Sequence, residues 1–157
     1  MSDYTAPGLP GRIADLERRV AALEGHAVAP EPLAAGIIGY QGEVDFGGAL
    51  SWQIRFGAAG TLALPDGPRV DVLAALGHPV RAAIVRHLIA NGAQPAPALS
   101  EAAGLRSTGQ LYHHLKALVA AKVVEQDSRG SYQVPPTAVI PLLVILTAAS
   151  DVAGQLR

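Results

Sequence analysis

Hydrophobic residues recur at helical spacing through most of the second half of the chain. Residues 80–89 carry the apolar stripe of one helix, and residues 111–118 carry the stripe of another. Between them, Pro97 opens a short helix and Gly104 is placed as its left-handed stop. Residues 97–118 are therefore predicted to be two helices joined by a tight turn.

A β-hairpin is predicted directly after the second of these helices. Val123 and Val124 start its first strand, residues 127–130 form the turn, and Tyr132 and Val134 alternate inward on the return strand. A helix-turn-helix followed by such a wing is a shape that presents one helix to a groove of DNA. The pattern therefore favours nucleic-acid binding.

The start of the second helix has the sequence of a capped helix that can bind an anion. Ser107 suits an N-cap, and Gln110 three residues later completes a capping box. Arg106 and Ser107 stand at the positive end of the helix dipole, so they suit a phosphate oxygen.

The side of this helix that faces away from its leucines carries residue types that contact DNA. Glutamine can bond the edge of adenine, tyrosine can contact a phosphate or a thymine methyl, and lysine binds phosphate. An arginine at the wing tip is favoured in a minor groove, the alternative being a solvated turn residue. The predicted DNA-binding residues are Arg106, Ser107, Thr108, Gly109, Gln110, Tyr112, His113, Lys116 and Arg129.

The adjacent pair His113 and His114 is not expected to bind a metal. Neighbouring side chains on a helix point about 100° apart, and no carboxylate stands at helical spacing to complete a zinc site. His114 shares a side with Leu111 and Leu118, so we expect it to be packed with one hydrogen bond. The chain contains no cysteine, and we expect neither a metal nor another cofactor.

Residues 37–66 are predicted to form a β-hairpin or meander. Apolar residues alternate with polar residues or glycine on both sides of a Gly-Gly pair at 47–48, and Thr61 to Leu64 are expected to add a third strand. The segment holds four aromatic residues, Tyr40, Phe46, Trp52 and Phe56. The favoured interpretation is a small sheet that extends the core, and the alternative is a ligand platform or a contact to the DNA backbone.

The segment before this sheet is expected to begin with a disordered tail, residues 1–11. Residues 12–25 have apolar positions spaced 3, 4 and 3, which predicts a short coiled-coil helix. The alternative is an amphipathic helix packed on its own domain, because two heptads are too few to hold alone. Residues 26–36 are interpreted as a linker.

The last predicted helix, residues 137–156, is apolar nearly all round. A terminal helix on the surface is not expected to have this pattern, so we expect it to be buried against a second copy in a symmetric dimer. The predicted dimerisation residues are Ile13, Leu16, Val20, Leu23, Val139, Leu142, Leu143 and Leu146.

The fold class that follows is α+β: a winged helix-turn-helix domain over residues 69–157 with a C-terminal dimerisation helix, an N-terminal heptad helix and a small antiparallel β segment. Residues 65–68 are expected to be a turn and residues 70–76 a short helix. Residues 1–68 carry four basic and eight acidic side chains, whereas residues 69–157 carry eight basic and five acidic ones. The predicted DNA-binding half is thus the basic half, as phosphate binding requires.

No signal peptide is evident in residues 1–30, and the most apolar run, Ala138 to Ala149, is too short to span a bilayer. We therefore expect a cytoplasmic protein with no membrane partner. No glycine-rich phosphate loop or nucleophile elbow is present in the sequence, so we do not expect an enzyme.

Residues 70–150 resemble the ArsR/SmtB-type winged-helix repressors. The resemblance lies in the segment Leu73–Arg81, in Tyr112–Leu118 at the end of the recognition helix, and in the Arg129-Gly130 wing. It implies a dimeric transcriptional regulator that binds double-stranded DNA through the recognition helix and the wing, and dimerisation through the first and last helices. Metal sensing is not implied, because cysteines are absent and the last helix has no histidine.

The sequence leaves open whether a small-molecule or protein effector exists. It also leaves an alternative function, a protein-interaction or scaffold module that uses the winged helix and the coiled coil without DNA.

Overall fold

A computed structural model describes residues 35–157 of the chain. The predicted tail 1–11, the predicted coiled-coil helix with Ile13, Leu16, Val20 and Leu23, and most of the predicted linker lie outside the described residues. The described chain falls into two compact units, which we treat separately. The stem unit comprises residues 35–40 and 53–63, and the helical unit comprises residues 41–52 and 64–157.

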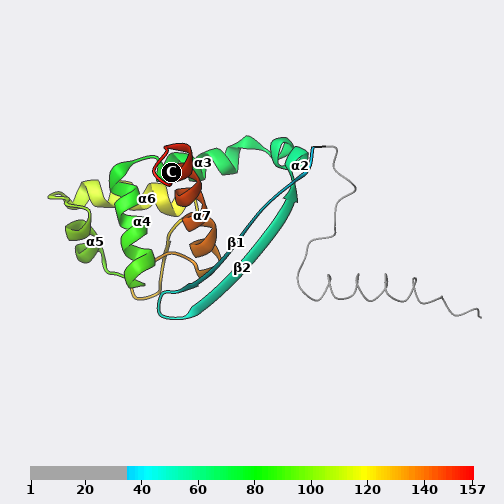
Figure 1. Cartoon of the computed structure of the whole chain (residues 1–157). Helices are drawn as coiled ribbons and strands as arrows, with labels where there is room; N and C mark the ends of the chain where they lie inside the picture. Colours follow the sequence, from blue (N-terminus) through cyan, green and yellow to red (C-terminus); the bar gives the residue numbers. More distant parts are fainter. Residues whose placement is uncertain (1–34) are drawn as a thin grey trace, which may run out of the picture. The chain divides into compact units, whose positions relative to one another are not determined.

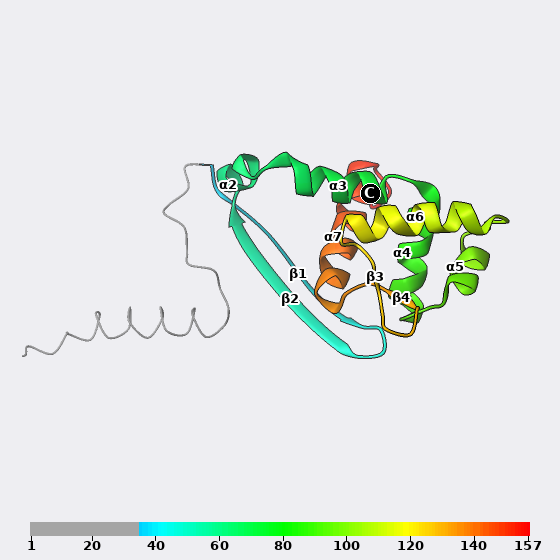
Figure 2. The same ribbon diagram turned by 180° about the vertical axis from the view of Figure 1, so that it is seen from behind.

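The helical unit contains the predicted helix-turn-helix and a small wing (Figures 1 and 2). Its elements in chain order are α3 (Asp66–Leu76), α4 (Pro79–Asn91), α5 (Ala96–Ala102), α6 (Thr108–Ala120), β3 (Glu125–Gln126), β4 (Tyr132–Gln133) and α7 (Pro136–Val152). The expected helices are present, with α3 beginning four residues before the expected start and α7 ending at Val152 instead of Leu156. Asp66, expected in a turn, is the first residue of α3, and its carboxylate accepts a hydrogen bond from Arg69 Nε at 2.8 Å.

The corner between α3 and α4 is held by two side chains that bond to helix ends. The two helices meet at 89°. Arg81 donates from Nε to the carbonyl of Ala75 at 2.6 Å and from Nη2 to that of Ala74 at 2.7 Å, which satisfies carbonyls in the last turn of α3. His78 is the N-cap of α4, where its Nδ1 accepts from the backbone N–H of Val80 at 3.2 Å.

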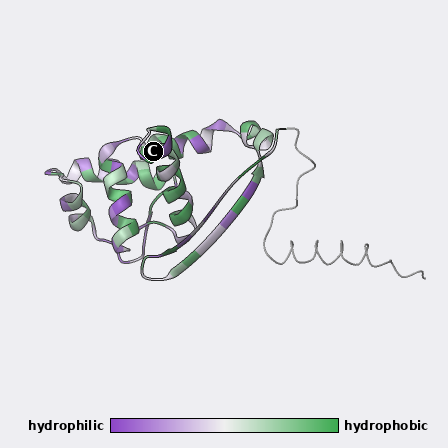
Figure 3. Ribbon diagram, in the orientation of Figure 1, coloured by the Kyte–Doolittle hydropathy of each residue, from purple (hydrophilic) through white to green (hydrophobic). Residues whose placement is uncertain are grey.

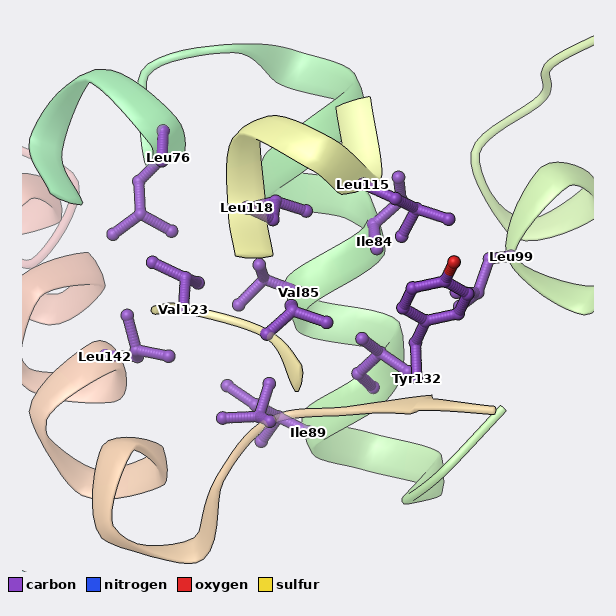
Figure 4. Close-up of a cluster of buried hydrophobic side chains, with 14 of the residues drawn as sticks. Leu76, Ile84, Val85, Ile89, Leu99, Leu115, Leu118, Val123, Tyr132 and Leu142 are labelled. Atoms are coloured by element: carbon purple, nitrogen blue, oxygen red, sulfur yellow. The ribbon is translucent and has the colours of Figure 1, made fainter. Parts of the chain in front are cut away.

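The core of the helical unit lies where α4, α6 and the segment after α6 meet (Figure 4). Its fully buried side chains are Ile84, Val85, Leu88, Leu99, Leu111, Leu115, Leu118, Val123 and Val124. The two valines were predicted to start a strand, and this prediction is wrong. Lys122 takes a left-handed φ of 58°, which turns the chain so that both valines enter the core, and the strand starts only at Glu125.

The wing is shorter than predicted, with two residues in each strand. Glu125 pairs with Gln133 and Gln126 with Tyr132 in an antiparallel ladder. Gln94, in the loop before α5, adds an isolated bridge, since it exchanges two backbone hydrogen bonds of 2.8 and 2.9 Å with Tyr132. The wing is therefore tied to the start of the helix-turn-helix.

The apolar helix α7 turns one side into the core of its own chain. Val139, Ile140 and Leu142 are buried, whereas Leu143 and Leu146 are half-buried. Figure 3 shows how continuous the apolar colouring of this helix is. Val139 and Leu142 were predicted to lie at a dimer interface. Their burial within the chain leaves them little surface to offer a second copy, and the contact between copies stays a prediction.

The predicted β-hairpin is present, and the predicted third strand is wrong. The strands are β1 (Ile37–Asp45) and β2 (Ala49–Gly57), and residues 58–63 form the short helix α2 (Ala58–Ala63). Alanine is the strongest helix former and occupies three of the six positions of α2, which favours a helix over a strand. Within this helix the Thr61 hydroxyl donates to the carbonyl of Gly57 at 3.1 Å.

The tip of the hairpin extends the core of the helical unit, as the favoured interpretation expected. Val44 and Leu50 pack against the buried cluster. Gly42 lies so close to Ile140 of α7 that a Cβ atom at this glycine would be 2.8 Å from the isoleucine Cγ2.

Among residues 35–157, no single helix is long and apolar enough to cross a membrane. Only α3 and α4 taken together are long and apolar enough, and these two helices are bent by 89° relative to each other.

Candidate nucleic-acid interface

The turn between α5 and α6 is fixed by a compact set of hydrogen bonds. Gly104 adopts a φ of 64°, the left-handed conformation that glycine takes without strain. The N–H of Leu105 donates to the carbonyl of Ser100 at 2.9 Å, and the Ser100 hydroxyl donates to the carbonyl of Leu105 at 3.0 Å. The angle at which α6 leaves the turn is thus determined by the backbone and by one serine.

Helix α6 has one buried and one exposed side. Leu111, Leu115 and Leu118 are spaced i, i+4, i+7 and are almost completely buried. The predicted contact residues on this helix are all exposed: Thr108, Gly109, Gln110, Tyr112, His113 and Lys116. Gly109, His113 and Lys116 repeat the i, i+4, i+7 spacing two residues earlier, so they form a stripe opposite the leucines.

The start of α6 leaves backbone donors free. Ser107 occupies the N-cap position with an extended backbone, but its side chain makes no capping hydrogen bond. The capping box predicted with Gln110 is therefore not formed. The first N–H groups of α6 lack this side-chain partner and point out of the helix end, where the dipole favours an anion.

Gly109 occupies a position where the fold does not require glycine. Its φ lies outside the left-handed region, and a Cβ atom there would meet only the Ser107 Oγ at 3.7 Å. Glycine in a helix costs about 0.5–1 kcal/mol relative to alanine, and nothing in the packing of this chain offsets that cost. The missing side chain instead opens the exposed stripe to a close approach by another molecule.

The wing tip is organised by Asp127. Its carboxylate accepts hydrogen bonds from the backbone N–H groups of Arg129 at 2.8 Å and Ser131 at 2.9 Å. Gly130 adopts a φ of 86° and donates its N–H to the Asp127 carbonyl at 3.1 Å. The backbone of Arg129 is thereby fixed, while its side chain is exposed.

Three predicted cations are exposed and available to phosphates. The side chains of Arg106, Lys116 and Arg129 make no hydrogen bond or ion pair with any other residue in the described part of the chain. Arg81, by contrast, is engaged with the end of α3. The basic excess of this half of the chain is therefore carried in part by groups that can bind an anion.

The histidines of α6 differ from the prediction in one respect. His114 was expected to be packed with one hydrogen bond, but its Nδ1 is buried without a partner. Its ring contacts that of His78 at 4.6 Å between centroids and that of His113 at 5.8 Å. Burial lowers the pKa of His114, and the charges of His78, Arg81 and His113 lower it further, so the fold favours the neutral form of this histidine.

No group of three or more potential ligands that could hold a metal ion occurs among residues 35–157. The two adjacent histidines of α6 belong to different faces: His113 lies on the exposed stripe and His114 against His78.

Three functional details escaped the sequence reasoning. They are the hydrogen bonds of Arg81 to the end of α3, the hydrogen bonds of Asp127 at the wing tip, and the ring contact of His78 with His114. The residue types alone do not predict these contacts. An aspartate followed within three residues by a glycine is nevertheless typical of an Asx turn. The segment Asp127–Gly130 has this pattern, so the bonds of Asp127 could have been predicted.

The comparison with protein families agrees with this geometry. Residues 76–127 match a family described as helix-turn-helix domain. The match spans the end of α3 through the first wing strand, so it includes the exposed stripe of α6, and it supports a helix-turn-helix regulator without singling out the ArsR/SmtB type. No curated protein matches the chain.

Proposed function

We propose that this chain is a dimeric, sequence-specific DNA-binding transcriptional regulator, with α6 in the major groove and the wing on the adjacent minor groove. The observation that carries the proposal is the stripe of Gly109, His113 and Lys116, exposed opposite three buried leucines on the second helix of a helix-turn-helix. An α-helix fits the major groove, and its exposed side chains then meet the edges of bases.

The flanks of the stripe supply the residues proposed to discriminate bases. Gln110 lies on one flank and Tyr112, half exposed, on the other. Arg106 and the free N–H groups at the start of α6 are proposed to bind a phosphate and so set the depth of the helix in the groove. Arg129 is proposed to reach the minor groove from the wing.

Two copies are needed because one helix-turn-helix reads only a few base pairs. In such dimers the recognition helices meet half-sites separated by about one helical turn, roughly 34 Å. Leu143 and Leu146 of α7 remain half-buried in one chain, and we propose that they contribute to the contact between copies. The resemblance to the ArsR/SmtB-type repressors supports the same arrangement.

The first test is the salt dependence of binding by the full chain to a random fluorescent duplex. If each copy neutralises three phosphates through Arg106, Lys116 and Arg129, the logarithmic slope is expected to be roughly −5 for a dimer. A protein-interaction module would show no binding at low salt, and that result would reject the proposal.

The second test separates base reading from phosphate binding. Sequences selected by the wild-type chain from a random library define its operator, and footprinting on the DNA upstream of its own gene locates a natural site. Gln110→Ala and Tyr112→Ala are expected to reduce the preference for that operator over random DNA by about tenfold or more. Gln155→Ala, an exposed glutamine after α7, is the control. Unchanged preference in both α6 variants would remove these residues from the proposed interface.

A further inference from the structure

The two strands of the hairpin share one apolar face that runs along its whole length. The carbonyl of Gly36 accepts a hydrogen bond from the N–H of Ala58 at 3.0 Å, so even-numbered residues of the two strands lie opposite each other on the same face. That face carries Ile38, Tyr40, Gly42, Val44, Leu50, Trp52, Ile54 and Phe56, with no charged residue. The opposite face begins with Ile37 and Gly39 and then carries the polar residues Gln41, Glu43, Ser51, Gln53 and Arg55.

This face is covered at the tip and uncovered at the stem. Val44 and Leu50 of the tip pack on the core, and Gly42 contacts Ile140. In the stem unit, by contrast, Ile38 is 57% exposed and Ile54 is 40% exposed.

The exposed area of this face in the stem unit is large enough for a small stable interface. Ile38, Ile54 and Phe56 are exposed and Tyr40 is half-buried. Large side chains present roughly 150–250 Å² when fully exposed, so these four together offer roughly 300 Å² of apolar surface. The smaller specific interfaces take about 600 Å² from each partner, of which a little over half is apolar. The two apolar areas are of similar size.

The backbone of the hairpin also leads us to expect that another molecule packs against it. Its sheet has only two strands, so each strand has an edge without a neighbour in that sheet. An isolated two-stranded hairpin is marginally stable in water, and exposed edges pair readily with another strand. A hairpin with nine residues in each strand and an uncovered apolar stem therefore requires a partner.

We infer that the partner is a second copy of this chain, whose own stem covers the apolar face formed by Ile38, Tyr40, Ile54 and Phe56. Two identical apolar faces without charge are self-complementary, which is the condition for a contact about a two-fold axis. The inference deepens the dimer of the proposed function and gives it an interface outside the helix-turn-helix. Its test contains no DNA, so it can fail while DNA binding stands.

The test compares two doubly substituted full-length chains by sedimentation equilibrium over a range of concentrations. Ile38→Thr with Ile54→Thr removes apolar surface from the stem while keeping β-branched side chains that suit strands. Gln41→Thr with Gln53→Thr places the same residues on the opposite face and is the matched control. The first variant is expected to raise the dimer dissociation constant by roughly 100-fold or more, because four apolar side chains are lost from each dimer. The control is expected to change it less than threefold.

Equal dissociation constants for the wild-type chain and the stem variant would overturn the inference. So would a wild-type chain that stays monomeric at all concentrations, since the stem would then be covered by another part of the chain or by a different protein.

A second measurement tests the same interface in case the stem variant fails to fold. The chain has no cysteine, so Ile54→Cys accepts a single nitroxide label. The label is expected to become immobilised as the chain is concentrated through its dimer transition, whereas a label on Gln53→Cys stays mobile. A label at position 54 that remains mobile in the dimer would overturn the inference.

Discussion

Gly109→Ala is expected to stabilise the protein and weaken its binding to DNA. The substitution adds one methyl group at the second position of α6, where the backbone already has helical geometry and the nearest atom of another residue, Ser107 Oγ, is 3.7 Å away. Replacing glycine by alanine at a compatible site raises the free energy of unfolding by about 0.4–1 kcal/mol, because the unfolded chain loses freedom.

The loss of DNA affinity follows from the position of the methyl group. It lies on the exposed stripe at the end of α6 that is proposed to approach the duplex most closely. Pushing this helix end outward lengthens the hydrogen bonds from its N–H groups and from Gln110, and hydrogen bonds weaken steeply once their geometry is lost. Each lost bond to a charged phosphate costs about 1.5–3 kcal/mol, so operator affinity is expected to fall by roughly tenfold or more.

Gln155→Ala, at an exposed position after α7, is the control. Urea unfolding is expected to show a gain in stability for Gly109→Ala, and fluorescence anisotropy is expected to show a loss of operator affinity for Gly109→Ala but not for the control. Equal DNA affinity of Gly109→Ala and the wild-type chain would refute the close approach of α6.

Three further predictions concern the wing, the α3–α4 corner and the half-buried His114. Arg129→Ala is expected to weaken binding to all sequences alike and to reduce the salt slope of a dimer by roughly 2, and an unchanged slope would remove the wing from the interface. Arg81→Met keeps the aliphatic stem but loses both bonds to the end of α3, so the free energy of unfolding measured in urea is expected to fall by about 1.5–3 kcal/mol; an unchanged midpoint would contradict a stabilising role for these bonds. The pKa of His114 is lowered in the folded chain, so the unfolded chain binds a proton at this histidine more readily than the folded chain does. The contribution of the neutral His114 to the free energy of unfolding is therefore fully present above the ordinary histidine pKa of about 6.5. It is lost as the pH falls through the lower pKa of the folded chain. His114→Phe is expected to flatten this acid-side loss in thermal melts, and a wild-type profile in the variant would exclude His114 as its source.

Much of the helical unit could be predicted because the spacing of its apolar residues and the residues that end its helices indicate the same elements. The leucines of α6 have the spacing of a helix with one buried side, and Gly104 is the residue type that a left-handed stop favours. The exposed side of α6 then followed as the complement of the buried side. All nine predicted DNA-binding residues are exposed, and the proposed contacts themselves remain predictions.

Other features could not be predicted because they depend on a choice between two acceptable local structures. The pattern of Ser107 and Gln110 permits a capping box, yet the serine side chain does not bond to the helix. The alternation at Thr61 to Leu64 permits a strand, yet the alanines of this segment favour the short helix α2. In both cases the competing states differ by a small free energy that residue types alone do not reveal.

The same limit applies to the sides of α7. An apolar pattern all round a helix shows that every side is covered, but it does not show which side faces the chain's own core. Val139 and Leu142 proved to face that core, and Leu143 and Leu146 did not enter it completely. What distinguishes these sides is the contact of Val139 and Leu142 with the buried cluster of the helical unit.

The hairpin is a second case of this kind. Its sequence pattern shows which residues share the apolar face, but it does not show what packs against that face. Strict alternation places Ile38, Tyr40, Ile54 and Phe56 on one side whatever packs against them. At the tip, Gly42 lets Ile140 approach, so this helix covers the face with residues of the same chain. In the stem the corresponding positions carry Tyr40 and Ile38, whose large side chains increase the apolar area that needs a partner. A glycine permits the close approach of a helix, whereas large apolar residues leave more area to be covered, so the change from Gly42 to Tyr40 supports the second copy that we propose as the partner of the stem.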